Sequence, residues 1–536
     1  IRRVAVLGAG IMGTGIAAHL ANAGIDSVLF DIVPKDAPEG NEKARTKFAI
    51  DAIAAAKKSK PASFYDNDFA SRITPANYDD HTELLASCDW VIEVVVERLD
   101  IKQKIYKWVA DNAPSHAILS SNTSGIPLSD LTSDMSDDMK SRFLITHFFN
   151  PVRYMRLLEL VTGPDTKEEV AQTIADFGAR VLGKGIVWGK DTPNFVANRI
   201  GLYGIASVFH HMDEHDLTIT EIDSIFGGAM GRAKSAVFRT GDVVGIDTLL
   251  HTFDNVYEGA TDDEERNRFI APDYVKNLVT SGATGEKAGK GFYKKTKENG
   301  KTVILALNPK TGEYEKQEKT RFPSIGKARG KDTSAQKIEA IVYGDDKAAQ
   351  VAWDVTADTL IYSANRIPEI ADDIVNLDNG MKWGFGWDLG PFETWDAIGV
   401  SKSIEKMEAE ESFAEQLEAD QVQNLAHPFV EQVLITPSHR HISLRRGKTL
   451  WRNPRQGHGP DLKKTDGRGR SFGIVVSAGG PRAAVQDGAT FTTSDGFAAH
   501  ALFTPEVRSQ KGRQAAPCTA HAQRAETQLR RRDHRR

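Results

Sequence analysis

A histidine and a glutamate in two nearby apolar stretches could form a proton-transfer pair. His147 ends an apolar run in "ITHFFNPVRYMRLLEL" (residues 145–160), and Glu159 is the only carboxylate in "LLELV" (residues 157–161). A buried carboxylate is costly unless it is paired, and an imidazole within reach offers a partner. Glu159 would fix the tautomer of His147 and stabilise the imidazolium that forms when the ring accepts a proton. The alternative is a hydrogen-bonded core histidine and an edge-strand acid that faces water.

A glycine-rich loop near the N-terminus could hold a dinucleotide. "RRVAVLGAGIMGTGIAAHLANAGIDSVLFD" predicts a strand, a turn, a helix and a second strand, with Gly8, Gly10 and Gly13 in the spacing G-x-G-x-x-G. Gly8 permits the tight turn, Gly10 lets the backbone approach a pyrophosphate, and Gly13 lets helix and strand pack closely. Ile11 and Met12 lie at the helix N-terminus that faces the anion.

The acid that ends the second strand indicates which dinucleotide. Asp31 lies 23 residues after Gly8, where a carboxylate can accept hydrogen bonds from an adenosine ribose. The same carboxylate would repel a 2′-phosphate, so the sequence predicts NAD rather than NADP. FAD is the alternative cofactor for such a loop.

The elements that must position these residues form an α/β domain. Strand-like runs separated by helical segments predict a Rossmann-like, doubly wound and mostly parallel sheet, followed by two related all-α domains. Ligands of such sheets bind beyond the carboxyl ends of the strands. Glu97, Asn122, Ser124 and His147 all fall at or just past strand ends, in the predicted strands at residues 89–97, 116–122 and 142–148.

The amino-acid composition limits the classes of protein to which this chain can belong. Hydrophobic residues make up 40% and charged residues 26% of the 536 residues, which is typical of a globular protein. No apolar run approaches the roughly 20 residues that span a bilayer. Two cysteines are too few for a disulfide framework, so we expect a reducing, cytoplasmic location. Nucleic acid is not expected as a partner, and no metal site is predicted.

Six separated motifs together resemble the 3-hydroxyacyl-CoA dehydrogenase family of fatty-acid β-oxidation, in its long form with a duplicated helical domain. They are "GAGIMGTGIAAHLANAG", "VVVERLDIKQKIY", "SSNTSGIPLSDL", "THFFNPVRYMRLLEL", "KDTPNFVANRIG" and "GEKAGKGFYKK", in family order from residue 1 to about residue 295. The resemblance implies that NAD oxidises a (3S)-3-hydroxyacyl-CoA to the 3-oxoacyl-CoA. Long relatives also carry an enoyl-CoA hydratase part, which is not recognisable in this chain.

The resemblance also assigns roles to individual residues. It implies that His147 is the catalytic base and Glu159 its partner, and that Ser124 and Asn198 hold the substrate oxygen. Locally, Thr192 and Pro193 predict the start of a helix, with Asn198 just over one turn in. The positions implied to contact the cofactor, besides the loop and Asp31, are Glu97, Lys102, Asn122, Asn150 and Lys287.

Two other classes of protein share parts of this pattern. A dehydrogenase of small β-hydroxy acids would use a catalytic lysine in the helical domain instead of the pair on the sheet. A non-enzymatic NAD-binding protein would have no need of His147, Glu159, Ser124 and Asn198. The intact pair and its two companions favour the acyl-CoA dehydrogenase over both.

An internal repeat organises the region after the sheet. "FRTGDVVGIDT" (residues 238–248) and "FETWDAIGVSK" (residues 392–402) share F-x-x-x-D-x-x-G at an offset of 154 residues. This predicts an NAD-binding domain at residues 1–189 and two helical domains, at residues 190–296 and 335–412. A charged connector with a hairpin at "NPKTGEY" occupies residues 297–334. The second helical domain is expected to replace a dimer partner, which gives a monomer or a subunit of a β-oxidation complex.

The last part of the chain differs in composition. From residue 421 to the end there are 16 Arg and 4 Lys against 8 Asp plus Glu, whereas the family resemblance stops within about twenty residues of Gly399. We interpret residues 413–536 as an Arg-rich tail without catalytic function, either disordered or translated out of frame.

Deleting residues 413–536 should therefore leave dehydrogenase activity unchanged. The measurement compares NADH formation from 3-hydroxybutyryl-CoA by the full chain and by a chain that ends at residue 412. A large loss of activity, or a compact protease-resistant fragment from about residue 425 onward, would show that the tail is a functional segment.

Overall fold

The computed structural model describes residues 1–316, 320–410, 473–476, 490–492 and 498–502. The chain divides into two units, residues 1–446 and residues 447–536, and each is described by itself.

Eight strands form one sheet in the order β3-β2-β1-β4-β5-β6-β7-β8. Neighbouring strands run parallel except for β6 and β7, which pair antiparallel. This confirms the predicted Rossmann-like, mostly parallel sheet. The strand order reverses between β1 and β4, and such a switch point is where these sheets bind ligands. The strands are β1 (Arg3–Leu7), β2 (Asp26–Asp31), β3 (Ile73–Asn77), β4 (Trp90–Glu93), β5 (Ile118–Ser121), β6 (Phe143–Phe148), β7 (Leu157–Thr162) and β8 (Gly185–Gly189).

Helices bury both faces of this sheet. Alternate residues of a strand point to opposite faces, and in β1 Val4 and Val6 join one apolar core while Ala5 and Leu7 join another. The first core also contains residues of α1, α3 and α8, and the second contains residues of α4, α5, α6 and α7. Most residues on both faces of these strands are therefore apolar, as expected of a doubly covered parallel sheet. The helices are α1 (Ile11–Asn22), α2 (Glu42–Arg45), α3 (Lys47–Ala56), α4 (Thr82–Leu85), α5 (Leu99–Asn112), α6 (Leu128–Thr132), α7 (Asp137–Ser141) and α8 (Glu168–Arg180).

The region after β8 is mostly helical and has a single continuous apolar core. A three-stranded antiparallel sheet, β11-β10-β9, interrupts it. The helices are α9 (Ala197–Glu214), α10 (Ile219–Ile225), α11 (Phe238–Val244), α12 (Ile246–Gly259), α13 (Asp273–Thr280), α14 (Pro323–Ala328), α15 (Ser334–Val342), α16 (Lys347–Asn365), α17 (Ile374–Gly384), α18 (Pro391–Ile398) and α19 (Val400–Glu408), and the strands are β9 (Tyr293–Glu298), β10 (Lys301–Leu307) and β11 (Tyr314–Glu315).

The predicted connector contains two hairpins rather than one. β10 and β11 pair across the predicted turn at "NPKTGEY". β9 and β10 pair across Asn299 and Gly300, which both have positive φ, 50° and 76°. Asn-Gly between two strands is a strong hairpin signal in a sequence, so this turn could have been predicted from the residues alone.

The two segments that share F-x-x-x-D-x-x-G have the same local structure. In each, a helix ends at a glycine with positive φ and the next helix begins directly after it: α11, Gly245 and α12 in one, α18, Gly399 and α19 in the other. An aspartate from the preceding helix caps each first helix. Asp223 accepts hydrogen bonds from the backbone of Phe238 and its neighbours, and Asp378 accepts them from Phe392 and Glu393.

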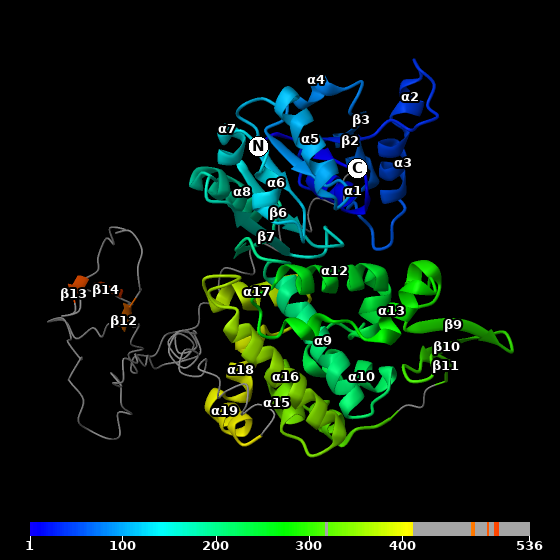
Figure 1. Cartoon of the computed structure of the whole chain (residues 1–536), viewed down its shortest axis with the longest axis vertical. Coiled ribbons are helices and arrows are strands. Elements are labelled where there is room, and N and C mark those ends of the chain that lie inside the picture. The colour runs from blue at the N-terminus through cyan, green and yellow to red at the C-terminus, as the bar shows by residue number, and fades with distance from the viewer. Residues whose placement is uncertain (317–319, 411–472, 477–489, 493–497, 503–536) are drawn as a thin grey trace, which may run out of the picture. The chain divides into compact units, whose positions relative to one another are not determined.

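The long helices α9 and α16, one from each half of the helical region, pack against each other (Figure 1). Tyr203 and Tyr362 stack with ring centroids 3.7 Å apart. The buried guanidinium of Arg199 bonds to Asp263, at 2.5 Å, and to the Tyr362 hydroxyl. Arg366 of the segment after α16 joins the same aspartate at 3.3 Å. The two halves are thus joined by a buried ionic network as well as by apolar packing.

The prediction for the tail lies mostly outside the described residues. In residues 447–536 the structure describes three short strands, β12 (Gly473–Val476), β13 (Thr490–Thr492) and β14 (Ala498–Leu502), paired antiparallel in the order β12-β14-β13. Over the described residues of the whole chain, no helix has the length and apolar character needed to cross a membrane.

The capping aspartates predict a pH dependence of stability. Burial raises the pKa of Asp378 to about 7, and backbone hydrogen bonds from Phe392 only partly oppose it. The folded state therefore keeps a proton that the unfolded chain has lost, and the free energy of unfolding should fall as pH rises from about 4 to about 7. Asp378→Asn removes this group, so urea denaturation should show a smaller fall over that range for the variant than for the wild type. Asp332→Asn, at an exposed aspartate, is the control. Parallel curves for wild type and Asp378→Asn would contradict the assignment.

Candidate active site

The glycine-rich loop has the geometry that dinucleotide binding requires. Gly8 has φ +115°, and a Cβ there would lie 2.6 Å from the Val94 carbonyl oxygen. A Cβ on Gly13 would lie 1.9 Å from the Gly8 carbonyl oxygen, so helix α1 could not approach the loop. Nothing lies within 4 Å of the corresponding point on Gly10. The open space at Gly10, at the N-terminus of α1, is where the pyrophosphate of a dinucleotide is predicted to lie.

Side chains predicted to contact the cofactor lie around this loop. Asp31 at the end of β2 accepts a hydrogen bond from the Ala9 backbone, with Oδ2 2.7 Å from the nitrogen, so its carboxylate lies beside the loop. Ile11 is 79% exposed at the first turn of α1, and Met12 is half-buried beside it. An exposed isoleucine at this point suits contact with a ligand rather than with the core.

His147 and Glu159 form the predicted pair. They are directly opposite each other in the antiparallel pairing of β6 and β7, which places both side chains on the same face of the sheet. His147 Nδ1 lies 2.7 Å from Glu159 Oε2, and both residues are buried. Phe149 and Phe195 pack on the imidazole with ring centroids 4.5 and 5.7 Å away. Because Nδ1 is engaged by the carboxylate, the ring's other nitrogen, Nε2, is the one left to exchange a proton.

Glu159 has a second contact that the sequence did not reveal. Its Oε1 accepts a hydrogen bond of 2.7 Å from the backbone nitrogen of Ala197, the first residue of α9. The predicted helix start at Thr192 and Pro193 is therefore wrong. Asn194 and Phe195 have positive φ, 62° and 51°, which separates Pro193 from the helix. The cap comes instead from a carboxylate 38 residues earlier in the chain, and no local sequence pattern encodes it.

Two asparagines, Asn198 and Asn122, lie beside residues that contact or adjoin the His147–Glu159 pair. Asn198 is the second residue of α9 and is half-buried, next to the Ala197 nitrogen that Glu159 binds. Asn122 follows β5, and its Oδ1 accepts a hydrogen bond from the Phe148 backbone at 2.9 Å. This amide fixes the end of β5 against the end of β6, directly beside His147.

Glu97 lies four residues beyond the end of β4, where several donors hold its carboxylate. Lys102 Nζ is 3.1 Å away, the Thr123 hydroxyl bonds to it, and the backbone nitrogens of Ser124 and Gly125 donate at 3.2 and 3.3 Å. Burial by itself would raise the pKa of Glu97, but Lys102 and these hydrogen bonds outweigh it and lower the pKa. Glu97 thus fixes the loop that carries Ser124 as a half-buried side chain.

Lys102 was predicted to contact the cofactor, but its side chain is buried among acidic groups. Its side chain is 1% exposed, and Nζ lies 2.8 Å from Glu93 Oε1 and 3.1 Å from Glu97. Glu93, which the sequence analysis missed, also accepts hydrogen bonds from Tyr106 and Ser121. Glu93 is the only acid in the apolar run "WVIEVVV" (residues 90–96), which is the same signal that singled out Glu159, so this pattern could have found it.

The remaining predicted residues lie at the edges. Asn150 is exposed, two residues after β6. Lys287 is half-exposed, and its Nζ lies 2.7 Å from Asp247 in the first turn of α12. The structure does not bring Lys287 into hydrogen-bonding contact with any other predicted site residue.

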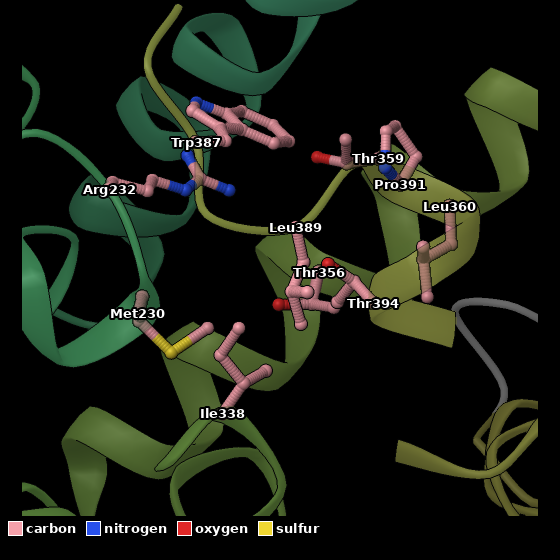
Figure 2. A pocket seen from close by; sticks show the side chains of 10 residues that line it. All are labelled: Met230, Arg232, Ile338, Thr356, Thr359, Leu360, Trp387, Leu389, Pro391 and Thr394. Carbon is pink, nitrogen blue, oxygen red and sulfur yellow. The ribbon is translucent and has the colours of Figure 1, made fainter. Parts of the chain in front are cut away.

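A pocket in the helical region lies apart from all of these residues (Figure 2). Met230 and Arg232 line it from the first half and Ile338, Leu389 and their neighbours from the second. The Arg232 guanidinium packs over the Trp387 ring, 4.1 Å from its centroid, and burial lowers its pKa to about 10. Because none of the predicted site residues lines this pocket, it is not part of the candidate active site.

The fold and loop define a dinucleotide-binding α/β protein of the dehydrogenase type, and comparison with known proteins names its family. Residues 3–192 match the NAD binding domain of 3-hydroxyacyl-CoA dehydrogenase, and residues 195–295 match the C-terminal domain of the same family. The chain belongs to the 3-hydroxyacyl-CoA dehydrogenase family. This confirms the resemblance and, through the NAD binding domain, the prediction of NAD as cofactor.

Individual relatives agree with the family match. A probable 3-hydroxyacyl-CoA dehydrogenase of Bacillus subtilis is 46% identical over 417 residues, which cover 76% of this chain and 52% of that protein. One of Deinococcus radiodurans is 43% identical over 298 residues, which cover 56% of this chain and 84% of that protein. The 3-hydroxybutyryl-CoA dehydrogenase structure from Escherichia coli has the same fold, with a TM-score of 0.55, 21% identity, and coverage of 77% of this chain and 96% of that one. The chain spans about half the length of the Bacillus relative and of two Rickettsia relatives.

The buried cluster around Lys102 predicts a large effect on stability. Lys102→Met would leave Glu93 and Glu97 without their shared cation, and breaking a buried ion pair from one side costs about 3–5 kcal/mol. Lys104→Met, at an exposed lysine of the same helix, should cost less than about 0.5 kcal/mol. Urea denaturation of the two variants measures the difference, and equal midpoints would show that the cluster does not depend on Lys102.

Proposed function

We propose that the chain catalyses NAD-dependent oxidation of (3S)-3-hydroxyacyl-CoA to 3-oxoacyl-CoA in fatty-acid β-oxidation, with His147 as general base. The observation that carries this proposal is the double contact of Glu159, to the His147 ring and to the Ala197 backbone. That carboxylate orients the ring and at the same time fixes the start of α9, which carries Asn198.

In the proposed reaction two hydrogens leave the substrate. NAD, when bound along the Gly8–Gly13 loop with its ribose at Asp31, supplies the acceptor for the hydride from C3. His147 Nε2 takes the proton from the C3 hydroxyl, and the carbon–oxygen double bond forms. The resulting imidazolium carries a positive charge next to Glu159 Oε2, 2.7 Å from Nδ1, and this ion pair favours proton transfer.

The substrate's oxygen needs hydrogen-bond donors as its charge develops. We assign Ser124 and Asn198 to this task, since each is half-buried. The Ser124 backbone donates a hydrogen bond to Glu97, and Asn198 directly follows Ala197, whose backbone donates to Glu159. Glu97, Asn122, Asn150 and Lys287 are proposed to contact the cofactor. For Lys102 the geometry supports an indirect role, in which its buried ammonium positions Glu97.

The two rival classes have less support. A dehydrogenase of small β-hydroxy acids would use a catalytic lysine in the helical domain, whereas here a buried histidine–carboxylate pair, His147 and Glu159, lies on the sheet. A protein that only binds NAD would not need a buried imidazole–carboxylate pair, which is costly to bury.

We also propose the domain limits, which are residues 1–189, 190–296, 297–334 and 335–412. In this scheme the second helical domain serves as an internal dimer partner. Membership of a β-oxidation complex and a cytoplasmic location also stay predictions, although relatives from Rickettsia and Psychrobacter are named as parts of fatty acid oxidation complexes.

His147→Ala should lower turnover with 3-hydroxybutyryl-CoA by about 10²–10⁴-fold, because general-base catalysis contributes that much, while the Kd for NAD stays near the wild-type value. Glu159→Gln should also lower turnover, by no more than His147→Ala. An amide that donates to Nδ1 would leave the proton on Nε2, where it blocks the base. NADH formation under saturating substrate measures turnover, and fluorescence titration measures NAD binding.

His19→Ala provides the control for this pair. His19 lies in the last turn of α1, at the end opposite the glycine-rich loop, and its Nε2 is 2.9 Å from the Leu182 backbone oxygen, so turnover should stay within a few-fold of wild type. Wild-type turnover in His147→Ala would refute the proposed base. Loss of NAD binding together with turnover would point to a folding defect instead of a missing base.

A further inference from the structure

The last turn of α9 carries a second group of histidines and acids. "HHMDEH" (residues 210–215) places three histidines and Glu214 within six positions. The start of α9, at Ala197, lies roughly 25 Å away at 1.5 Å per helical residue. The proposed reaction uses none of these side chains.

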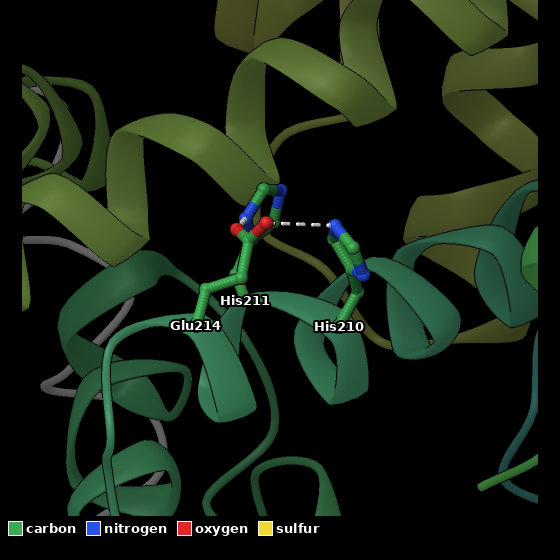
Figure 3. Close-up of side chains that lie close together, drawn as sticks. All are labelled: His210, His211 and Glu214. Atoms are coloured by element: carbon green, nitrogen blue, oxygen red, sulfur yellow. Dashed lines mark hydrogen bonds and ion pairs between the residues drawn. The ribbon is translucent and has the colours of Figure 1, made fainter. Parts of the chain in front are cut away.

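Two of the histidines converge on one carboxylate (Figure 3). Glu214 Oε1 lies 3.1 Å from His210 Nε2, and Glu214 Oε2 lies 2.7 Å from His211 Nδ1. The three ligand atoms lie within 4.8 Å of one another. Two imidazole nitrogens and one carboxylate are the donor set of many zinc and cobalt sites.

His211 is held in the orientation that a metal ligand needs. Its other nitrogen, Nε2, lies 2.9 Å from Asp358 Oδ2 on α16. A carboxylate behind the imidazole fixes the tautomer and leaves Nδ1 to coordinate, which is the usual arrangement around protein-bound zinc. Asp358 is itself held by the Ser207 hydroxyl at 2.8 Å.

Charge and access also favour a cation here. The carbonyl groups at a helix C-terminus carry a partial negative charge, which stabilises cations near the last turn. Asp354 and Asp358 add two carboxylates, against one guanidinium, Arg268, which lies 3.9 Å from Asp358. His210 and Glu214 are about half exposed, 45% and 50%, so water can reach the remaining coordination positions.

A second group shares His211 and could compete. His211, His215 and Asp354 also place one ligand atom each within 4.8 Å. However, His215 and Asp354 already form a pair of 2.8 Å between α9 and α16, and both are only partly exposed. Using them as ligands would break a contact between the two helices. A cation that binds to His210, His211 and Glu214 replaces only the protons that the two histidines share with Glu214.

We propose that His210, His211 and Glu214 bind a divalent transition-metal cation such as Zn²⁺ or Co²⁺, with Asp358 orienting His211. The cation would be coordinated by His210 Nε2, His211 Nδ1 and the Glu214 carboxylate, with water at its open positions. This site fixes the C-terminal turn of α9 and is separate from the dehydrogenase reaction.

The test is Co²⁺ binding to the full-length protein, followed by its visible absorption and by calorimetric titration. The wild type should bind one equivalent that His210→Ala and Glu214→Gln weaken by about ten- to hundredfold or more. Both substitutions lie at half-exposed positions, so the fold should be kept, and circular dichroism checks this. His116→Ala, at an exposed histidine on the sheet domain, and His215→Ala should both retain the binding.

Seven of the 15 histidines lie after residue 420. Comparison of the variants separates Co²⁺ binding at the proposed site from binding at these other histidines. Equal Co²⁺ affinity and spectra in the wild type, His210→Ala and Glu214→Gln would overturn the proposal. Loss of binding in His215→Ala with retention in His210→Ala would overturn it too, because the cation would then belong to the second group.

Discussion

One buried carboxylate, that of Glu159, joins the sheet to the helical region. It is fully buried, and each of its oxygens accepts a hydrogen bond of 2.7 Å, one from the His147 ring and one from the Ala197 backbone. A buried acid is tolerated only when it is paired in this way. Because the strand, the imidazole and the helix share the same group, the position of α9 and the orientation of His147 are not independent. A shift of either would leave one partner of the carboxylate unsatisfied.

Helix α9 extends this constraint through the helical region. Near its start Arg199 enters the buried network with Asp263 and Tyr362, and in its middle Ser207 bonds to Asp358 of α16. Buried charges are expensive to separate from their partners, so these contacts fix the register of α9 against α16. The second half of the helical region thereby supports the helix that begins at the candidate active site. This is consistent with the proposed role of the internal repeat as a partner for the first half.

Prediction from sequence succeeded where the signal is local. The strand, turn and helix at the N-terminus follow from periodicity and from glycines that no other residue could replace, since Gly8 has positive φ and Gly13 touches the Gly8 carbonyl. The His147–Glu159 pair was expected because a polar residue in an apolar strand is costly to bury unless it has a partner. The same argument applied to Glu93 would have found the cluster around Lys102. The hairpin turn at Asn299 and Gly300 could also have been predicted from the sequence, but it was not.

By itself, the sequence determined the class of fold, the nucleotide loop, the repeat of the helical segments and the identity of the family, because each depends on residues close together or on motifs in a fixed order. Only the tertiary structure decided where α9 begins, since its cap is a carboxylate 38 residues away. It alone placed Lys102 between the buried Glu93 and the partly exposed Glu97, and His211 between Glu214 of its own helix and Asp358 of another. The physical reason is the same in each case. The energy of a buried charge depends on the partners that folding brings near it, and a linear pattern does not specify which partners those are.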